Sequence, residues 1–149
     1  MSSIRNATPA DAGRIAEIEI FNYRLNFYPI FQNDDFYFDE LQVVSKAEKC
    51  RCDPEFSADT FVFDDGVVKG FIRIDGDEVK KLFVEPVLQG QGIGAKLLEY
   101  AIASHGVSHL WALEKNEKAI RFYERHGFSP TGERKLEEDT DEYLIHLRR

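Results

Sequence analysis

Cysteine is scarce in this sequence. Among 149 residues it occurs only as Cys50 and Cys52, with one residue between them. A disulfide across so short a gap is disfavoured by disulfide geometry, and no further Cys and no cluster of His completes a zinc-binding pattern. We therefore expect two reduced thiols, no metal site and a cytoplasmic location, because structural disulfides belong to oxidising compartments.

Positive charge is in the minority, and long apolar runs are lacking. Lys and Arg number 19 against 27 Asp and Glu, a net charge of −8, which argues against a nucleic-acid partner and is compatible with a cationic or amine acceptor. No apolar run is long enough to span a bilayer, so we expect no membrane partner. We also expect no secretory leader in residues 1–5 and one domain, 1–149. A homodimer stays open.

The stretch 82–98 predicts a strand, a glycine-rich turn and a helix. Its apolar strand stops before Pro86, which has no N–H to donate to a sheet. Gly90, Gly92 and Gly94 let the backbone turn sharply and approach a ligand closely. Apolar residues with helical spacing follow, so the turn leads into a helix N-terminus. Unpaired N–H groups and the helix dipole make such a terminus a phosphate site.

The identity of the phosphate ligand is narrowed by spacing. A P-loop is excluded, because the residue after Lys96 is not the Ser or Thr that holds magnesium. The spacing from Gly90 to Ala95 also fits a dinucleotide turn, with Glu114 about 20 residues on as a ribose-binding acid. That alternative, a nicotinamide-dependent oxidoreductase, is disfavoured because residues 85–89 separate the strand from the first glycine and because the motif lies mid-chain.

A second motif lies downstream. Residues 116–128 fit N-x-x-A-x-x-F-Y-x-x-x-G-F at every specified position, and residues 89–94 fit Q/R-x-x-G-x-G/A after an apolar strand that ends at Pro86. Together these motifs resemble the GNAT superfamily of acetyl-coenzyme A-dependent N-acetyltransferases. The resemblance is strong over residues 60–149 and extends to the N-terminal part in outline.

The resemblance implies both a fold and a function. The fold is α/β, a mixed and mostly antiparallel central sheet flanked by helices and splayed at its two central strands, with the acetyl group in the gap. The cosubstrate is acetyl-CoA, without a metal, and the acceptor is the primary amine of an unidentified small molecule or peptide. An alternative of another class stays open, a non-catalytic module that binds acyl-CoA.

The resemblance also assigns the coenzyme to three elements. Pantetheine pairs with the strand, backbone N–H groups of the glycine loop hold the pyrophosphate, and the helix of the second motif contacts the pantetheine arm. Arg is frequent at the first loop position, where Gln89 would donate hydrogen bonds without charge. The implied binding residues are Leu82, Phe83, Val84, Gln89, Gly90, Gln91, Gly92, Ile93, Gly94, Ala95, Asn116, Ala119, Phe122 and Tyr123.

Two residues are candidates for the proton transfers. By resemblance, Tyr123 is the general acid that reaches the coenzyme sulfur; the alternative is a tyrosine that packs beside Phe122 on an apolar helix face. Glu78 is the candidate general base, at the strand position where some family members place a catalytic glutamate. A carboxylate is a weak proton acceptor at neutral pH, so this role needs a raised proton affinity or a water relay. A solvated Glu78 and a water chain as base stay open.

The N-terminal half is predicted in less detail. Thr8 and Pro9 form a helix start with Asp11 in the first turn, the apolar face of that helix includes Phe21, and a further helix is expected at about 39–49. Seven Phe and Tyr residues lie between residues 23 and 38. Two interpretations of them stay open, packing of helices onto the sheet or lining of an acceptor pocket. The acidic run 137–142 is expected to be a solvated turn between the last two strands.

Overall fold

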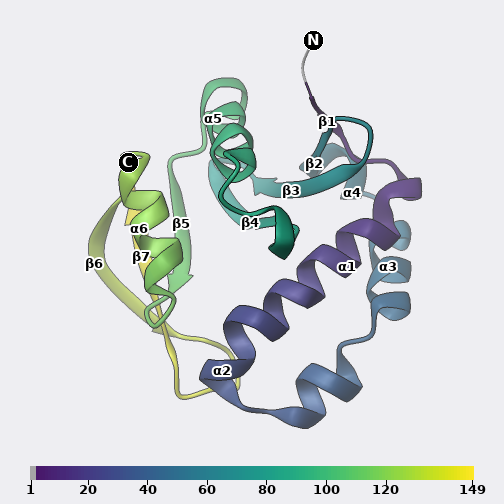
Figure 1. Cartoon of the computed structure of the whole chain (residues 1–149). Coiled ribbons are helices and arrows are strands. Elements are labelled where there is room, and N and C mark those ends of the chain that lie inside the picture. Colours follow the sequence, from purple (N-terminus) through teal and green to yellow (C-terminus); the bar gives the residue numbers. More distant parts are fainter. Residues whose placement is uncertain (1–2) are drawn as a thin grey trace.

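The computed structural model describes residues 3–149. Residues 1 and 2 belong to the expected domain and to the segment 1–5 in which no secretory leader is expected, and they lie outside the described residues. The strands form one sheet in the order β1-β2-β3-β4-β5-β7-β6 (Figure 1). Of the described strand pairs, β4 with β5 is parallel and the others are antiparallel, which confirms the expected mixed α/β sheet. The strands are β1 (Ile4–Asn6), β2 (Thr60–Asp64), β3 (Val68–Asp75), β4 (Glu78–Val84), β5 (His109–Leu113), β6 (Ser129–Leu136) and β7 (Tyr143–Arg148).

Helices flank this sheet. They are α1 (Ala12–Asn22), α2 (Tyr28–Phe31), α3 (Val43–Cys52), α4 (Phe56–Asp59), α5 (Ile93–His105) and α6 (Glu117–Arg125). Turns of 3₁₀ helix cover Pro9–Asp11 and Pro86–Leu88, and π-helical segments cover Tyr23–Phe27 and Phe36–Glu40. Within residues 3–149, none of the helices has the length and apolarity that crossing a bilayer requires.

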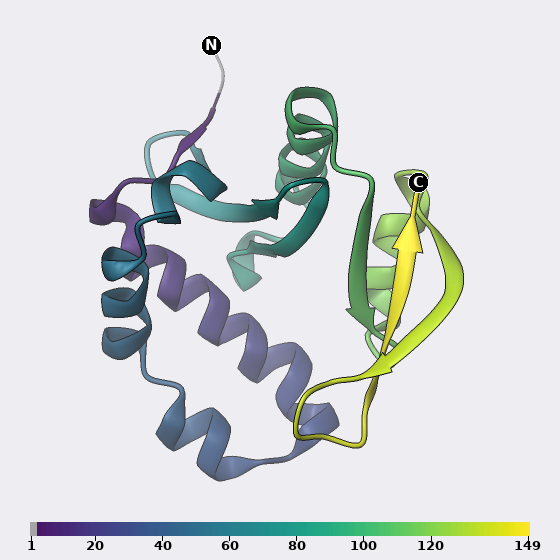
Figure 2. The same ribbon diagram turned by 180° about the vertical axis from the view of Figure 1, so that it is seen from behind.

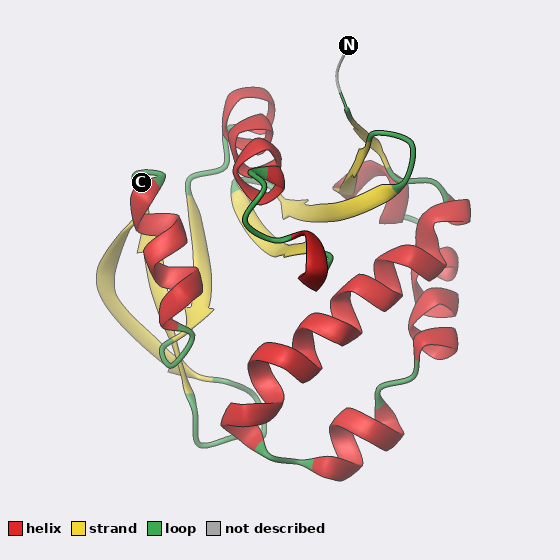
Figure 3. Ribbon diagram, viewed as in Figure 1, coloured by secondary structure: helices red, strands yellow, loops and turns green. Residues whose placement is uncertain are grey.

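The first four strands carry helices on both faces (Figure 3). Because successive strand side chains point to opposite faces, neighbours in β2 enter different cores. Phe61 packs in the core that includes Leu97 of α5, whereas Val62 packs in the core that includes Ile15 of α1 and Ala47 of α3. On the other half of the sheet, α6 lies alongside β5 and β7 (Figure 2).

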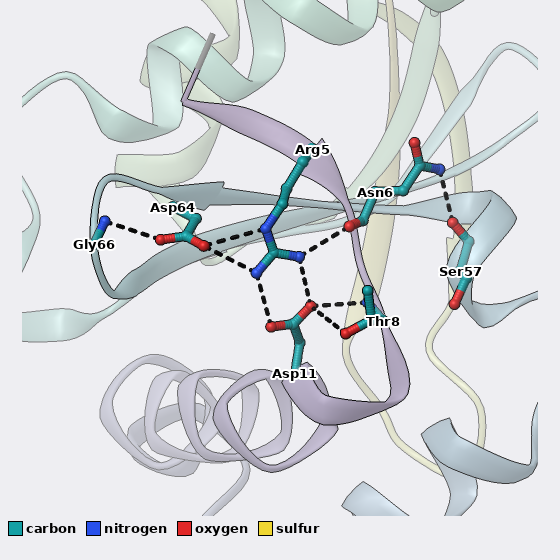
Figure 4. A network of polar contacts seen from close by, with 7 residues as sticks. All are labelled: Arg5, Asn6, Thr8, Asp11, Ser57, Asp64 and Gly66. Carbon is teal, nitrogen blue, oxygen red and sulfur yellow. Dashed lines mark hydrogen bonds and ion pairs between the residues drawn. The ribbon is translucent and has the colours of Figure 1, made fainter. Parts of the chain in front are cut away.

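A polar network fixes the start of α1 against the sheet (Figure 4). The Arg5 guanidinium donates to both carboxylate oxygens of Asp11, at 2.8 and 3.0 Å, and to Asp64 at 3.0 Å. Asp11 also accepts the backbone N–H of Thr8 at 2.8 Å, which confirms the predicted helix start. The Arg5 guanidinium holds the pKa of Asp11 below its usual value, although partial burial opposes this.

The helix predicted at 39–49 is wrong in its boundaries. The π-helical segment Phe36–Glu40 ends, Leu41 and Gln42 take extended backbone angles, and α3 begins at Val43. The Gln42 side chain donates to the Asp39 carbonyl at 2.8 Å, a side-chain to backbone bond that holds the chain outside a continuous helix.

The sheet opens between its two central strands, as expected. Strands β4 and β5 pair at Glu78 with His109 and at Val79 with Leu110, and no further pairing of these strands occurs in the part of the chain that the structure describes. Beyond this point they diverge (Figure 1). The second half of β4 therefore presents an unpaired edge toward β5.

Candidate active site

A cavity of about 810 Å³, here the glycine-loop cavity, lies beside the unpaired half of β4. It is bounded by the end of α1, by β4, by the glycine loop with the start of α5, and by α6. Its lining residues are Asn22, Leu25, Asn26, Phe27, Leu82, Phe83, Val84, Pro86, Leu88, Gln89, Gly90, Gly92, Ile93, Gly94, Ala95, Asn116, Lys118, Ala119, Phe122, Tyr123, Arg125 and His126. Every coenzyme-binding residue predicted from the sequence is among them except Gln91.

The glycine loop and the first turn of α5 form a cradle of backbone groups. Gly90 and Gly92 have φ values of +84° and +83°, and a Cβ at either position would meet no atom within 4 Å, so the loop surface there is open. The N–H groups of the first three residues of α5 have no intrahelical acceptor, and Lys96 is the first to bond back, to the Gly92 carbonyl at 3.0 Å. The N-cap residue is Gly92, which has no side chain that could cap this terminus. The cradle suits an anion such as a pyrophosphate.

The unpaired edge of β4 offers strand hydrogen bonds to an extended ligand. The Glu85 N–H bonds to the Lys69 carbonyl at 2.9 Å, on the side of β3. Backbone N–H and C=O groups of successive strand residues point to alternate edges of the strand. The backbone groups of Phe83 therefore also point toward β3, while those of Leu82 and Val84 point toward the gap. Both residues belong to the coenzyme-binding set that the resemblance implies.

The Gln89 side chain points into the protein, in contrast to its expected role as a donor to the coenzyme. Its Nε2 donates to Asn22 Oδ1 at 3.0 Å and to the Val84 carbonyl at 3.2 Å. Asn22, which is buried, donates in turn to the Val84 carbonyl at 2.9 Å. Because both amide hydrogens of Gln89 are used, the residue joins α1 to the end of β4 and shapes the loop. Sequence reasoning missed Asn22, which lies outside both motifs.

Tyr123 lines the glycine-loop cavity from α6. Asn116 caps this helix, accepting the Ala119 N–H at 3.4 Å. The Tyr123 ring packs edge-on against Phe122 and Phe128, with ring centres 5.2 and 5.9 Å apart. Burial raises the pKa of Tyr123 above its usual value, so the hydroxyl keeps its proton at neutral pH.

Glu78 lies apart from this group. It begins β4 at the closed end of the gap, where it pairs with His109, and its Oε2 is 3.5 Å from the Lys80 ammonium. Its side chain does not line the glycine-loop cavity. The structure thus brings Tyr123 to the loop but not Glu78.

A second cavity of about 740 Å³, here the acidic cavity, lies between the aromatic segment and the loop that joins β6 to β7. Phe27 lines both cavities. The sequence left the role of the aromatics open and predicted residues 137–142 to be a solvated turn; the turn is confirmed, and it also forms one wall of this cavity. The lining residues are Tyr23, Phe27, Ile30, Phe31, Asn33, Phe36, Tyr37, Glu40, Leu113, Glu137, Glu138, Asp139, Thr140, Asp141 and Glu142.

The charges that line the two cavities have opposite sign. Lys118 and Arg125 line the glycine-loop cavity, and no described carboxylate does. Conversely, no described Lys or Arg lines the acidic cavity. Although the whole chain is acidic, the loop side is therefore suited to an anion and the other side to a cation. Sequence reasoning missed Lys118 and Arg125, which both occupy unspecified positions of the second motif.

A buried ion network supports the wall between the cavities. Glu19, 1% exposed, contacts the ammonium groups of Lys81 at 2.5 Å and Lys46 at 3.2 Å, and accepts the Tyr23 hydroxyl at 2.8 Å. The lysines outweigh burial and keep the pKa of Glu19 below its usual value. The Tyr23 ring packs edge-on against Phe83 of β4 with centres 5.5 Å apart, so the network fixes Tyr23 beside the unpaired strand.

Comparison with known proteins agrees with this geometry. Residues 57–130 match the sequence model of the family described as "Acetyltransferase (GNAT) domain". The chain is 33% identical over 69 residues to the peptidyl-lysine N-acetyltransferase YjaB of Salmonella typhimurium. The aligned segment covers 46% of this chain and 48% of the relative. The match thus spans about half the length of this curated relative.

Solved structures extend the likeness to nearly the whole chain. An N-acetyltransferase from Staphylococcus aureus Mu50 superposes with a TM-score of 0.76 at 19% identity, covering 97% of this chain and 98% of that one. The PaiA N-acetyltransferase from Thermoplasma acidophilum, solved in complex with coenzyme A, gives 0.71 at 20% identity, covering 98% of each chain. The matched residues 57–130, which contain the open strand, the glycine loop and Tyr123, therefore form a GNAT acetyltransferase domain, and the solved structures show that the remaining residues share the fold of these proteins.

Proposed function

We propose that this protein is an acetyl-CoA-dependent N-acetyltransferase that acts on a primary amine. The observation that carries the proposal is the glycine-loop cavity, which joins a phosphate cradle to an unpaired strand edge and to a protonated tyrosine. The relatives named as N-acetyltransferases and the neighbour solved with coenzyme A support it.

The described residues fit acetyl-CoA. The cradle at Gly90 and Gly92 would hold the pyrophosphate, with Lys118 and Arg125 adding positive charge at the same cavity. The backbone groups of Leu82 and the N–H of Val84 would pair with the pantetheine arm through the open edge of β4, since the Val84 carbonyl already accepts from Asn22 and Gln89. When bound, the coenzyme supplies an acetyl group activated as a thioester, so that the new carbon–nitrogen bond replaces the carbon–sulfur bond, the amine loses a proton and the sulfur gains one.

Tyr123 is the proposed donor toward the sulfur. A thiol with a pKa of about 8.5 is a stronger acid than this tyrosine, so complete transfer from Tyr123 is uphill. The hydroxyl therefore acts chiefly by hydrogen bonding to the sulfur as negative charge develops on it, and the expected contribution to rate is moderate.

Glu78 stays our candidate for the proton that leaves the amine. Because its carboxylate lines neither cavity, it would act through a water relay rather than by direct contact. A water chain without Glu78 is the competing assignment, and mutation of Glu78 to Gln distinguishes the two.

Two measurements test the proposal. Acetyl-CoA at a hundredfold excess over its dissociation constant should stabilise the folded protein by about 2.7 kcal/mol, and coenzyme A should be released when an amine is added. Binding without release for any amine in a broad panel would favour the non-catalytic acyl-CoA module. Absence of both a melting shift and release would reject acetyl-CoA as the ligand.

A further inference from the structure

We propose that the acceptor is an aliphatic amine with at least two positive charges, one nitrogen reacting beside β4 while another is held in the acidic cavity. This inference rests on the proposed function and specifies its substrate class. Three properties of the acidic cavity support it: its aromatic walls, its uncompensated charge and its position next to the unpaired strand.

Aromatic rings form the walls. Tyr23 and Phe27 stack with ring centres 5.1 Å apart, and Tyr37 packs against Phe31 at 6.4 Å and edge-on against Phe36 at 5.0 Å. Faces of such rings attract alkylammonium groups, and their apolar surfaces accommodate a methylene chain. The cavity volume of about 740 Å³ falls in the range typical of small-molecule sites.

The negative charge of the cavity is largely uncompensated. Of its six carboxylates, Glu142 forms an ion pair with Lys115 at 2.8 Å, and the other five have no ion-pair partner among the described residues. The electrostatic field of these carboxylates reaches the aromatic wall. Burial raises the pKa of Tyr37 to about 12, and the negative charge of Glu137 contributes to this increase. A ligand with several cationic groups would neutralise charge that a single ammonium would leave unpaired.

The position of the cavity places the two charges in different surroundings. Its inner end is formed by Tyr23 and Phe27, next to Phe83 of β4. An apolar environment lowers the pKa of an amine and so favours the neutral, nucleophilic form. At the outer end the carboxylates favour the charged form of the second nitrogen. One molecule can thus present a reactive amine to the thioester and remain anchored by its ammonium group.

The test compares the diamine cadaverine with pentylamine, a monoamine with the same carbon chain. The test variant is Glu138→Gln/Asp141→Asn, because neither side chain has a hydrogen bond or ion pair within the described residues. The control is Glu55→Gln/Asp59→Asn, which makes the same charge change at the N-cap and the last residue of α4, outside the lining of both cavities. Each protein is titrated with each amine by calorimetry without coenzyme, at low and high ionic strength, and kcat/KM is then measured with acetyl-CoA.

Cadaverine should bind the unmodified protein and the control roughly tenfold more tightly than pentylamine, with kcat/KM following the same order. The preference should shrink in the cavity variant and at high ionic strength. Equal binding of the two amines, an unchanged preference in the cavity variant, or a higher kcat/KM for the singly charged Nα-acetyl-lysine amide would each overturn the inference. Because the titration needs no coenzyme, its result is separate from failure of acetyl-CoA to bind, which would reject the proposed function instead.

Discussion

At the scale of single residues, Tyr123 lines the glycine-loop cavity, and its ring and its hydroxyl have separate roles. Its ring packs against Phe122 and Phe128, which explains why the sequence alone also allowed a packing role. The hydroxyl has no hydrogen-bond partner among the described residues. Packing of the ring and chemistry at the oxygen are therefore separable by removing the oxygen alone.

For Tyr123→Phe we expect a fold and a coenzyme affinity close to those of the parent, because the ring is retained. Turnover should fall by roughly 10- to 10³-fold if the hydroxyl stabilises the departing sulfur. Steady-state kinetics at saturating acetyl-CoA and a binding titration of the same variant check this, since an interaction made in the transition state lowers kcat without changing binding. Tyr100→Phe on α5, outside both cavities, is the control. Full activity of Tyr123→Phe would leave the residue a packing role.

Glu78→Gln tests the second proton transfer. If the carboxylate accepts the amine proton through water, the rate at neutral pH should fall by roughly 10²- to 10⁴-fold for full base function. The dependence of kcat/KM on pH should also change. The measurement is a pH–rate profile of variant and parent. A superimposable profile would assign the proton to a water chain and leave Glu78 as a residue of the closed end of β4, where it faces Lys80.

At the scale of elements, the glycine loop could be predicted from the sequence and the acidic cavity could not. The loop is a local structure, because positive φ at Gly90 and Gly92 and the helix start after them depend on adjacent residues. The acidic cavity needs Tyr37 to meet the loop at 137–142, a contact between segments about a hundred residues apart that periodicity does not encode. The prediction that Phe21 lies on the apolar face of α1 was wrong, because Phe21 is 39% exposed whereas Ile20 is buried.

Gly92→Val tests the loop as the phosphate cradle. A β-branched residue strains a backbone with φ of +83° and places a side chain on the open surface where the phosphate would lie. The free energy of acetyl-CoA binding should fall by far more than the free energy of unfolding does. Gly76→Val is a matched control, because Gly76 also has a positive φ and free space around its Cβ position but lies in the β3–β4 turn. Calorimetric titration with acetyl-CoA decides; normal binding by a folded Gly92→Val protein would move the pyrophosphate elsewhere.

At the scale of the whole molecule, a sheet that opens between β4 and β5 is combined with two cavities of opposite charge. Basic side chains line the glycine-loop cavity, and carboxylates line the acidic cavity. The two motifs, through the family that they resemble, predicted the α/β fold and most of the residues of the glycine-loop cavity. The break at Leu41 and Gln42 and the inward Gln89 side chain were not predictable, because each depends on a hydrogen bond made only in the folded chain. The N-terminal attachment of α1 rests on such bonds as well, and these respond to pH.

Arg5→Met tests that attachment. The folded pKa of Asp11 is lowered, chiefly by Arg5, so this interaction stabilises the fold above the unfolded carboxyl pKa of about 3.9 and is lost as pH falls through the folded value. Because Arg5 is partly exposed, we expect a loss of about 1 kcal/mol in the free energy of unfolding at neutral pH. Urea unfolding of variant and parent at several pH values measures the difference.

The difference between the two proteins should shrink as the pH is lowered below about 3.9, because a protonated Asp11 gains little from Arg5 in either state. Arg51→Met removes an exposed ion pair with Glu48 on α3 and should change stability little at any pH. A difference between Arg5→Met and its parent that stayed constant from neutral to acidic pH would show that Arg5 acts through packing of its aliphatic stem. In that case the carboxylate would not be what ties the start of α1 to β1 and β2.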